Sequence, residues 1–500
     1  MFNQLFRLSK HTIIYGLGAA ASYIVSFFLI PVYTRYLTPD DYGILAIFTA
    51  SMPFAGVLLG LGLASALLRF YFNYNEEKER KEAISSVLLF LTVISFLFLL
   101  ALIPARKQIS LLIFGSDQYA SSFLYISLIV VCDIGNTVAF VVLRAREESK
   151  KYVAFFLAQC TVDAGLKVYF LVVLHRGVPG ILEAQLISVS FLYLILVGSI
   201  IRGTGLKLSL TKLKAMLRFG LPLVPAGIST SVMLLSDRYL LQFLSTSHEL
   251  GLYSLGCNLG GVIQALLITP FITAWFPFMF DIAKEKNARQ IYSSVLTYFV
   301  LVGMFGVLVI SVLSQDFMRI MATPAFYDAY KVVPMLVFSR LLTGCYAVFA
   351  AGVYLENKTK YMPIIVGASA LLNLGMNYLL IPSYGMMGAA AASVLSTLFM
   401  VIAMFFVSER LYPIKYDFGR VLKVFLSAIL IYIASLYITN DSAVIEGVLK
   451  ALTLLTYPAL LYLFKFYRPE EIQKGREVLR SAVKYIKAKF TREHPANLER

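Results

Sequence analysis

The sequence predicts an all-α integral membrane protein with about 14 transmembrane helices: two parallel six-helix repeats forming two lobes around a central cavity, plus two extra C-terminal helices. Three observations lead to this prediction. Of the 500 residues, 59% are hydrophobic and 14% are charged, whereas about a quarter are charged in soluble domains. Apolar runs of about twenty residues, long enough to cross a bilayer as helix, recur along the chain. The third observation is an internal duplication.

The apolar runs define the expected spans in order. The first run, about 12–33, is longer than the core of a signal peptide, which is about 7–15 residues. The other runs of the first repeat are 43–69, 84–104, 118–143, 153–174 and 180–201. Those of the second repeat are 219–242, 251–275, 293–313, 329–354, 362–382 and 386–408. Two more, 424–438 and 447–465, lie outside the duplication. Thirteen spans is the nearest alternative, because 424–438 is short.

The duplication is visible at the start of each repeat. Aromatic-Gly-Leu opens both copies, Arg-Tyr-Leu follows about twenty residues later at Arg35 and Arg238, and a glycine closes both at Gly43 and Gly251. Farther along, REESKKY (146–152) is matched by LENKTKY (355–361). Because each copy contains an even number of spans, both copies point the same way, related by an axis along the membrane normal.

The duplication and the charge pattern set the domains and the orientation. We expect a first repeat at 1–210, a second at 211–410, two additional helices at 411–466 and a basic amphipathic tail at 467–500. With the N-terminus placed inside, about 34 of the 44 Lys and Arg residues fall on the inside. Both termini are therefore predicted to be cytoplasmic. The tail is predicted to bind anionic lipid, and a plain solvated helix is the alternative.

Composition argues against several functions. The net charge of +16 is explained by topology, so no nucleic-acid partner is expected. The four cysteines lie in apolar runs without C-x-x-C spacing, and the four histidines form no cluster. We therefore expect no metal, no cofactor and no catalytic residue.

Ionisable residues inside spans are the best local indication of function, because each costs roughly 2.5–3.5 kcal/mol to insert and usually faces a cavity or a partner. The basic candidates could bind a diphosphate, to which Arg donates bidentate hydrogen bonds. They are Arg35, Lys167, Arg238 and Arg340. The acidic candidates for ion coupling are Asp133, Asp163 and Asp237.

Each candidate also has a structural explanation. Asp163 and Lys167 have i, i+4 spacing and could neutralise each other. Arg35 and Arg238 lie near the ends of their spans and could extend to the membrane interface. Asp133 could make a structural hydrogen bond to a neighbouring helix.

At PVYTRYLTPDDYG, FGLPLVP, SDRYLLQFLSTSHELGLY and YGMMGAAAAS the chain resembles bacterial polysaccharide flippases of the multidrug, oligosaccharidyl-lipid and polysaccharide exporter superfamily. The resemblance implies a multi-pass protein of the bacterial cytoplasmic membrane, not an enzyme. It also implies alternating-access transfer of an undecaprenyl-diphosphate-linked oligosaccharide to the outer leaflet. Expected partners are that lipid, membrane lipids, and the polysaccharide polymerase and glycosyltransferases of the same pathway. By position, the four basic candidates fit the role of cationic cavity residues.

Two alternatives stay open from the sequence. A multidrug or cation antiporter of the same superfamily would rely on membrane carboxylates more than on arginines. A membrane glycan polymerase or ligase usually carries a large outside loop, whereas the longest outside loops expected here have about a dozen residues.

Overall fold

The computed structural model describes residues 25–438, 440, 443–469 and 471–473. Almost all of these residues are helical, and they contain no β-strand. Twelve helices in this part of the chain are long and apolar enough to cross a membrane. The predicted all-α membrane fold is therefore confirmed.

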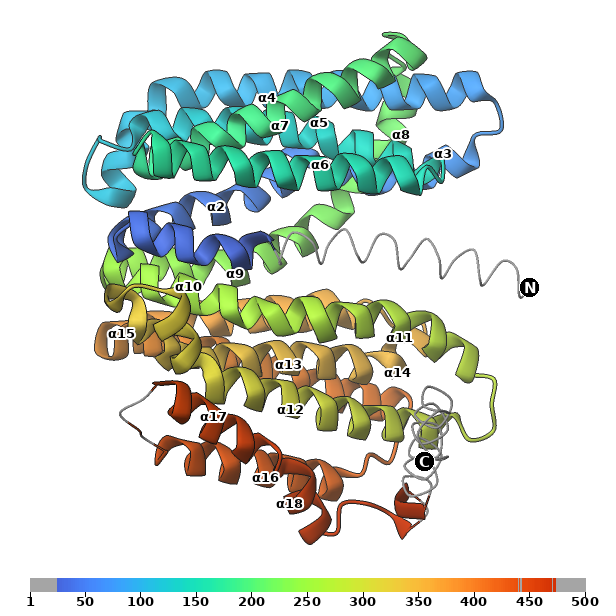
Figure 1. Ribbon diagram of the computed structural model, residues 1–500. Coiled ribbons are helices and arrows are strands. Elements are labelled where there is room, and N and C mark those ends of the chain that lie inside the picture. Colours follow the sequence, from blue (N-terminus) through green and yellow to red (C-terminus); the bar gives the residue numbers. More distant parts are fainter. Residues whose placement is uncertain (1–24, 439, 441–442, 470, 474–500) are drawn as a thin grey trace, which may run out of the picture.

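The helices of the first repeat lie side by side along one long direction (Figure 1). They are α2 (Pro39–Gly60), α3 (Leu63–Asn73), α4 (Glu77–Phe114), α5 (Ala120–Ala145), α6 (Ser149–Val168) with the π-helical turn η1 (Tyr169–Val173), and α7 (Gly177–Thr204). The helix α8 (Leu210–Gly220) and the short turn η2 (Leu221–Leu223) then lead to the second repeat.

The second repeat forms another layer, below the first in Figure 1. It contains α9 (Val224–Leu244), α10 (Ser247–Ile263) with the π-helical turn η3 (Gln264–Ile268), α11 (Thr269–Ile282), α12 (Ala288–Met321), η4 (Pro324–Val332), α13 (Val333–Phe349), α14 (Ala351–Leu355) and α15 (Tyr361–Leu411). The remaining helices, α16 (Phe418–Leu436), α17 (Ala443–Leu454) and α18 (Tyr457–Leu463), pack outside this layer.

The predicted spans overlap these helices but do not match them at every position. The predicted first span, 12–33, lies mostly outside the described residues, of which 25–36 are helical. Spans 362–382 and 386–408 fall within α15, which is broken at Gly385, where φ is 52° and ψ is −130°. Span 43–69 is divided between α2 and α3, because Leu61 and Gly62 adopt left-handed backbone conformations.

The two repeats begin their second helices in the same way. Thr38 caps α2 by accepting a hydrogen bond from the Asp41 backbone N–H at 3.2 Å, and Thr246 caps α10 by accepting one from the Glu249 N–H at 3.2 Å. A Ser or Thr cap with an acidic residue three positions later is a strong helix start. The same type of cap is thus present at the equivalent position of each predicted repeat.

The same two helices cross at the paired glycines. A Cβ atom on Gly43 would lie 2.2 Å from the Ser247 carbonyl oxygen, and a Cβ on Gly251 would lie 1.9 Å from the Pro39 carbonyl oxygen. Gly43 therefore faces Ser247, four residues before Gly251, and Gly251 faces Pro39, four residues before Gly43. Small residues allow membrane helices to approach this closely. The reciprocal contact is consistent with an approximate twofold axis between Gly43 and Gly251.

The additional helices are joined to the second repeat by a buried charge cluster between α17 and α12. The Lys450 ammonium lies 2.5 Å from a Glu446 oxygen and 3.3 Å from an Asp316 oxygen, and the other Glu446 oxygen lies 3.0 Å from the Arg319 guanidinium. The side chains of Lys450, Glu446 and Asp316 are at most 10% exposed. Two positive and two negative charges thus hold α17 against α12.

Replacing Lys450 with Met is expected to lower the free energy of unfolding by about 3–5 kcal/mol, because removing one partner of a buried ion pair leaves the other uncompensated. Asp316 would lose the only cation within ion-pair distance among the described residues. Thermal unfolding of the purified protein in detergent measures the change. The exposed Lys415 supplies the control variant Lys415→Met, which should unfold like the wild type. Equal midpoint shifts for the two variants would contradict a stabilising role for the cluster.

The chain after α18 is fixed to α16 and α12. The Arg420 guanidinium contacts both Glu471 oxygens, at 3.0 and 2.8 Å, and lies 4.3 Å from the centre of the Phe466 ring. Burial raises the pKa of Glu471, but the hydrogen bond from Tyr298 and the charge of Arg420 outweigh it and hold the pKa below its usual value. The rest of the predicted amphipathic tail, 474–500, lies outside the described residues.

Candidate functional site

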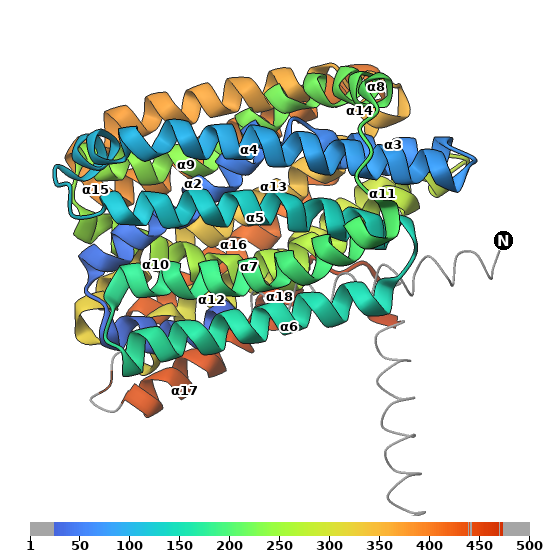
Figure 2. The same ribbon diagram turned by 90° about the horizontal axis from the view of Figure 1, so that it is seen from above.

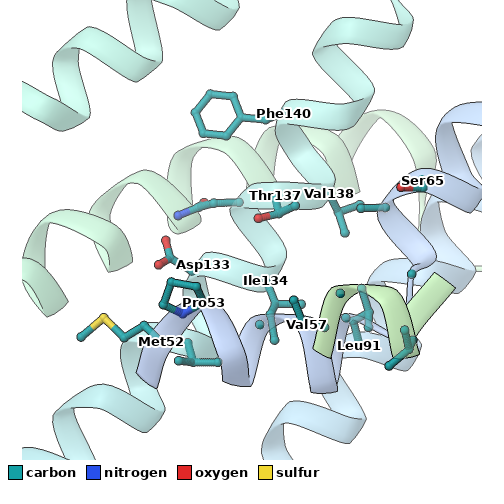
Figure 3. Close-up of a pocket in the computed structure, with 18 of the residues that line it drawn as sticks. Met52, Pro53, Val57, Ser65, Leu91, Asp133, Ile134, Thr137, Val138 and Phe140 are labelled. Carbon is teal, nitrogen blue, oxygen red and sulfur yellow. The ribbon is translucent and has the colours of Figure 1, made fainter. Parts of the chain in front are cut away.

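The larger of two adjoining cavities lies mainly within the first repeat (Figure 3). Cavity 1, of about 760 Å³, is bounded by α2, α3, α4, α5, α6, α7, η2 and the start of α9. Most of its wall is apolar, and Figure 3 shows the Asp133 carboxylate beside Pro53. Its polar side chains are Thr49, Ser65, Asp133, Asn136, Thr137, Gln159 and Gln185. Side-chain amides and hydroxyls on an apolar wall can bind a polar ligand in a defined orientation.

Cavity 2 is smaller, about 310 Å³, and lies where both repeats meet. Helix 25–36, α2, α6 and α7 supply one side, and α9 and α10 supply the other. Its polar residues include Tyr33, Tyr42, Asp163, Lys167, Arg238, Ser254 and Asn258. Thr49 lines both cavities, so cavity 2 adjoins cavity 1. Three of the predicted site residues are therefore brought together between the repeats.

Asp163 and Lys167 form an ion pair in cavity 2. The Lys167 ammonium lies 2.7 Å from one Asp163 oxygen, and their side chains are 14% and 23% exposed. The second Asp163 oxygen is buried and has no hydrogen-bond partner within the described chain. The neutralising pair expected from i, i+4 spacing is present, but one oxygen of the carboxylate still faces no donor.

Asp133 belongs to the same group of charges. It lines cavity 1 and lies within electrostatic range of both Asp163 and Lys167. No described residue makes a hydrogen bond to its side chain, so the alternative of a structural hydrogen bond is not seen among the described residues. Asp133 thus lines cavity 1, and Asp163, Lys167 and Arg238 line the adjoining cavity 2.

Asp237 occupies a separate site inside the second repeat. Its buried carboxylate accepts hydrogen bonds from Tyr253 at 2.6 Å and Ser393 at 2.6 Å, and from the amides of Asn377 at 2.7 Å and Asn373 at 3.2 Å. Helices α9, α10 and both halves of α15 contribute to this network. All four donors are neutral, and among the described residues no cation forms an ion pair with this carboxylate.

The remaining two candidates lie apart from cavity 2. Arg340 is partly buried on α13, and both Arg340 and Arg238 lie within electrostatic range of Cys257 on α10. No carboxylate in the described chain pairs with Arg340. Arg35 is exposed at the end of helix 25–36 and lines neither cavity.

Sequence reasoning missed several residues of these sites. Tyr33 and Tyr42 line cavity 2, their ring centres 6.3 Å apart, and Tyr42 accepts a hydrogen bond from Asn258 at 2.6 Å. Tyr253 and Ser393 were not expected beside Asp237. The chain contains 31 tyrosines, and no sequence pattern separates these from the others.

No group of three metal-ligating side chains occurs among the described residues, and none of the four cysteines forms a disulfide. The helical membrane fold of the described residues is shared with solved membrane transporters. Residues 8–283, more than half of the chain, match the family described as polysaccharide biosynthesis protein. The chain belongs to this family, which confirms the family resemblance seen in its motifs.

Curated relatives are distant in sequence. The succinoglycan biosynthesis transport protein ExoT of Rhizobium meliloti is 22% identical over 344 residues, which cover 66% of this chain and 65% of ExoT. The chain thus spans less than two thirds of ExoT. The Lsg locus putative protein 1 of Haemophilus influenzae is 23% identical over 305 residues, covering 59% of this chain and 72% of that protein.

Solved structures share the fold. The lipid II flippase MurJ in an inward closed conformation matches with a TM-score of 0.73 at 15% identity, covering 91% of this chain and 100% of MurJ. An inward-facing multidrug resistance MATE family transporter of the MOP superfamily matches with a TM-score of 0.59 at 16% identity, covering 81% and 96%. The protein is therefore a multi-pass membrane protein with the fold of this superfamily.

Proposed function

We propose that this protein is a flippase that moves an undecaprenyl-diphosphate-linked oligosaccharide across the bacterial cytoplasmic membrane by alternating access. The observation that carries the proposal is the pair of adjoining cavities, with Lys167 and Arg238 at the point where the repeats meet. Membership of the polysaccharide biosynthesis family supports the substrate class.

The two cavities suit the two parts of such a substrate. Arg238 would bind the diphosphate through bidentate hydrogen bonds, and Lys167 would add a second positive charge when the diphosphate competes with Asp163. Cavity 1, within the usual range of about 300–1,000 Å³ for ligand sites, would take sugar units. Its amides, from Gln159 and Gln185, offer donors and acceptors to hydroxyl groups.

The contact between Gly43 and Gly251 lies at the end where α2 and α10 begin, whereas cavity 1 reaches Gly62 and Ser65 toward the other end. With cytoplasmic termini, the glycine crossing is on the outer side and the cavities are reached from the cytoplasm. In the proposed mechanism, repeats 1–210 and 211–410 are the moving lobes, and 411–466 and the tail 467–500 accompany the second lobe. Arg340 would meet the diphosphate once the lobes move, and Arg35 would act at the outer end.

Ion coupling is proposed at the carboxylates. Asp237 is the favoured position because only neutral groups donate to it in the described chain. Asp133 in cavity 1 and Asp163 in cavity 2 are further candidates. The same observation supports the second candidate function, a multidrug or cation antiporter of the superfamily. The enzymes that make and polymerise the oligosaccharide, glycosyltransferases and a polymerase, are the proposed protein partners.

The test is flipping of a fluorescent undecaprenyl-diphosphate oligosaccharide in proteoliposomes. Arg238→Ala is expected to reduce the rate about tenfold to a hundredfold, because hydrogen bonds to charged groups contribute about 1.5–3 kcal/mol. Arg340→Ala is also expected to reduce it. Arg146→Ala, an exposed arginine outside both cavities, should flip at the native rate. Absence of native flipping, together with proton- or sodium-driven efflux of organic cations, would favour the antiporter instead.

A further inference from the structure

The helix that connects the two repeats has an unusual position. α8 lies crosswise to the long helices, as both views show (Figures 1 and 2). Leu213 and Met216 are buried and face α3 and α4, whereas Lys214, Ala215 and Arg218 are exposed. A short helix with one buried face and one basic face is typical of a membrane interface.

Exposed leucines surround this helix. They are Leu206, Leu208 and Leu210 before and at its start, and Leu221 after its end. Leu206, Leu208 and Leu210 are between 56% and 70% exposed. Large apolar side chains exposed beside basic ones favour contact with lipid over contact with water. We therefore expect α8 to lie at the membrane interface, where its basic side chains contact lipid headgroups and its exposed leucines contact acyl chains.

Three cations converge on one hollow between α3 and α8, with a volume of about 830 Å³. Arg69 comes from α3, and Lys214 and Arg218 come from α8. The residues that line the hollow include no carboxylate. Within the described chain none of the three cations forms an ion pair or side-chain hydrogen bond, whereas the neighbouring Lys212 lies 3.0 Å from Glu82. Of the three cations on α8 in the described chain, Lys212 is thus paired, whereas Lys214 and Arg218 are not.

The side chain of Arg69 is positioned by the aromatic ring of Phe219. Its guanidinium lies over the Phe219 ring, 4.5 Å from the ring centre. A guanidinium stacked in this way keeps its in-plane N–H donors available, and these match the spacing of phosphate oxygens. Close by, Gly62 and Gly220 are in backbone contact, since a Cβ on Gly62 would lie 2.4 Å from the Gly220 carbonyl oxygen. The two walls of the hollow are thus fixed to each other.

We propose that this hollow binds the phosphate headgroup of an anionic membrane phospholipid of the phosphatidylglycerol type. Three uncompensated cations favour a phosphate, and the exposed leucines favour one that carries acyl chains. The site is outside both cavities and does not depend on the substrate proposed for them. Because α8 joins the two repeats, a bound lipid bridges α3 to α8 and stabilises the arrangement of the repeats seen here.

The test uses the purified full-length protein in neutral detergent, with dioctanoyl-phosphatidylglycerol as the probe and binding measured by calorimetry. The variant Lys214→Gln/Arg218→Gln is expected to raise the dissociation constant roughly tenfold or more, as loss of two basic residues near a lipid phosphate predicts. Arg69→Gln, on the other helix, should weaken binding independently. The matched control Lys284→Gln/Lys286→Gln removes the same charge from an exposed loop of the second repeat and should bind like the wild type.

Competition identifies the ligand. Dioctanoyl-phosphatidylcholine and inorganic phosphate should compete only weakly, since one has no net charge and the other has no acyl chains. The proposal is overturned if both variants bind the probe like the wild type, if phosphatidylcholine binds equally well, or if inorganic phosphate alone displaces the probe at equal concentration. Displacement by undecaprenyl diphosphate at lower concentrations than by phosphatidylglycerol would instead make the hollow a landing site for a transported lipid.

Discussion

Replacing Asp237 with Ala is expected to give one of the largest losses of stability in the chain. The carboxylate accepts four hydrogen bonds, and three of the four donor residues, Tyr253, Asn373 and Asn377, are buried. Interhelical hydrogen bonds in membrane proteins contribute about 0.6 kcal/mol each on average, and those to charged groups contribute about 1.5–3 kcal/mol. The free energy of unfolding should therefore fall by at least about 2 kcal/mol. Thermal unfolding in detergent measures this change.

Two further variants distinguish the effect of losing the hydrogen bonds to Asp237 from the effect of losing its negative charge. Asp237→Asn keeps an acceptor, and the hydroxyls of Tyr253 and Ser393 can rotate to accept from its amide, so most of the stability should be retained. Asp281→Ala removes an exposed carboxylate on α11 and should have little effect. If Asp237→Ala unfolds at the wild-type temperature, the network does not hold α9, α10 and α15 together. If Asp237→Asn is stable but transport no longer responds to an ion gradient, Asp237 is the coupling site.

Replacing Gly251 with Val is expected to separate α2 from α10. Any Cβ at this position would meet the Pro39 carbonyl oxygen at 1.9 Å, and a backbone atom cannot rotate away. Overpacking usually costs about 1–3 kcal/mol, and more where nothing can move. The ends of the two repeats at this crossing should therefore move apart, or the protein should fail to fold. Distances between spin labels on α2 and α10 distinguish these two outcomes.

Gly367→Val is the matched control, because nothing lies within 4 Å of a Cβ at Gly367 on α15. It makes the same chemical change in another membrane helix and should preserve both the fold and the label distances. Unchanged distances and stability in Gly251→Val would show that the helices do not cross at the paired glycines. Gly43→Val tests the reciprocal side of the contact and should resemble Gly251→Val.

The spans could be predicted because lipid imposes a length and a composition on every helix that crosses it. Hydropathy does not show where the backbone turns and breaks a helix within an apolar run. Residues 43–69 read as one span, yet the chain turns at Leu61 and Gly62, because Gly62 packs directly against the Gly220 backbone. That contact joins parts of the chain far apart in sequence, and no local pattern indicates it.

The candidate site was predictable only where local spacing determined the geometry. The Asp163–Lys167 pair follows from i, i+4 spacing on one helix. Lys167 and Arg238 both line cavity 2, and four donors surround Asp237, only because of the way α6, α9 and α15 pack. A single sequence does not specify this packing. The functional roles of Arg35 and Arg340 stay predictions, because their positions at the helix end and on α13 do not by themselves define a ligand.

The crossing of α2 and α10 also bears on the origin of the chain. Gly43 contacts the segment of Gly251, and Gly251 contacts the segment of Gly43, as in the self-complementary interface of a symmetric dimer. In two identical subunits, Asp40 would face Asp40 across such an axis. Here the second copy carries His248, whose imidazole Nδ1 lies 3.7 Å from an Asp40 oxygen. Fusion of two ancestral copies into one chain removes the requirement that both halves change together, and lets a repulsive pair become a complementary one.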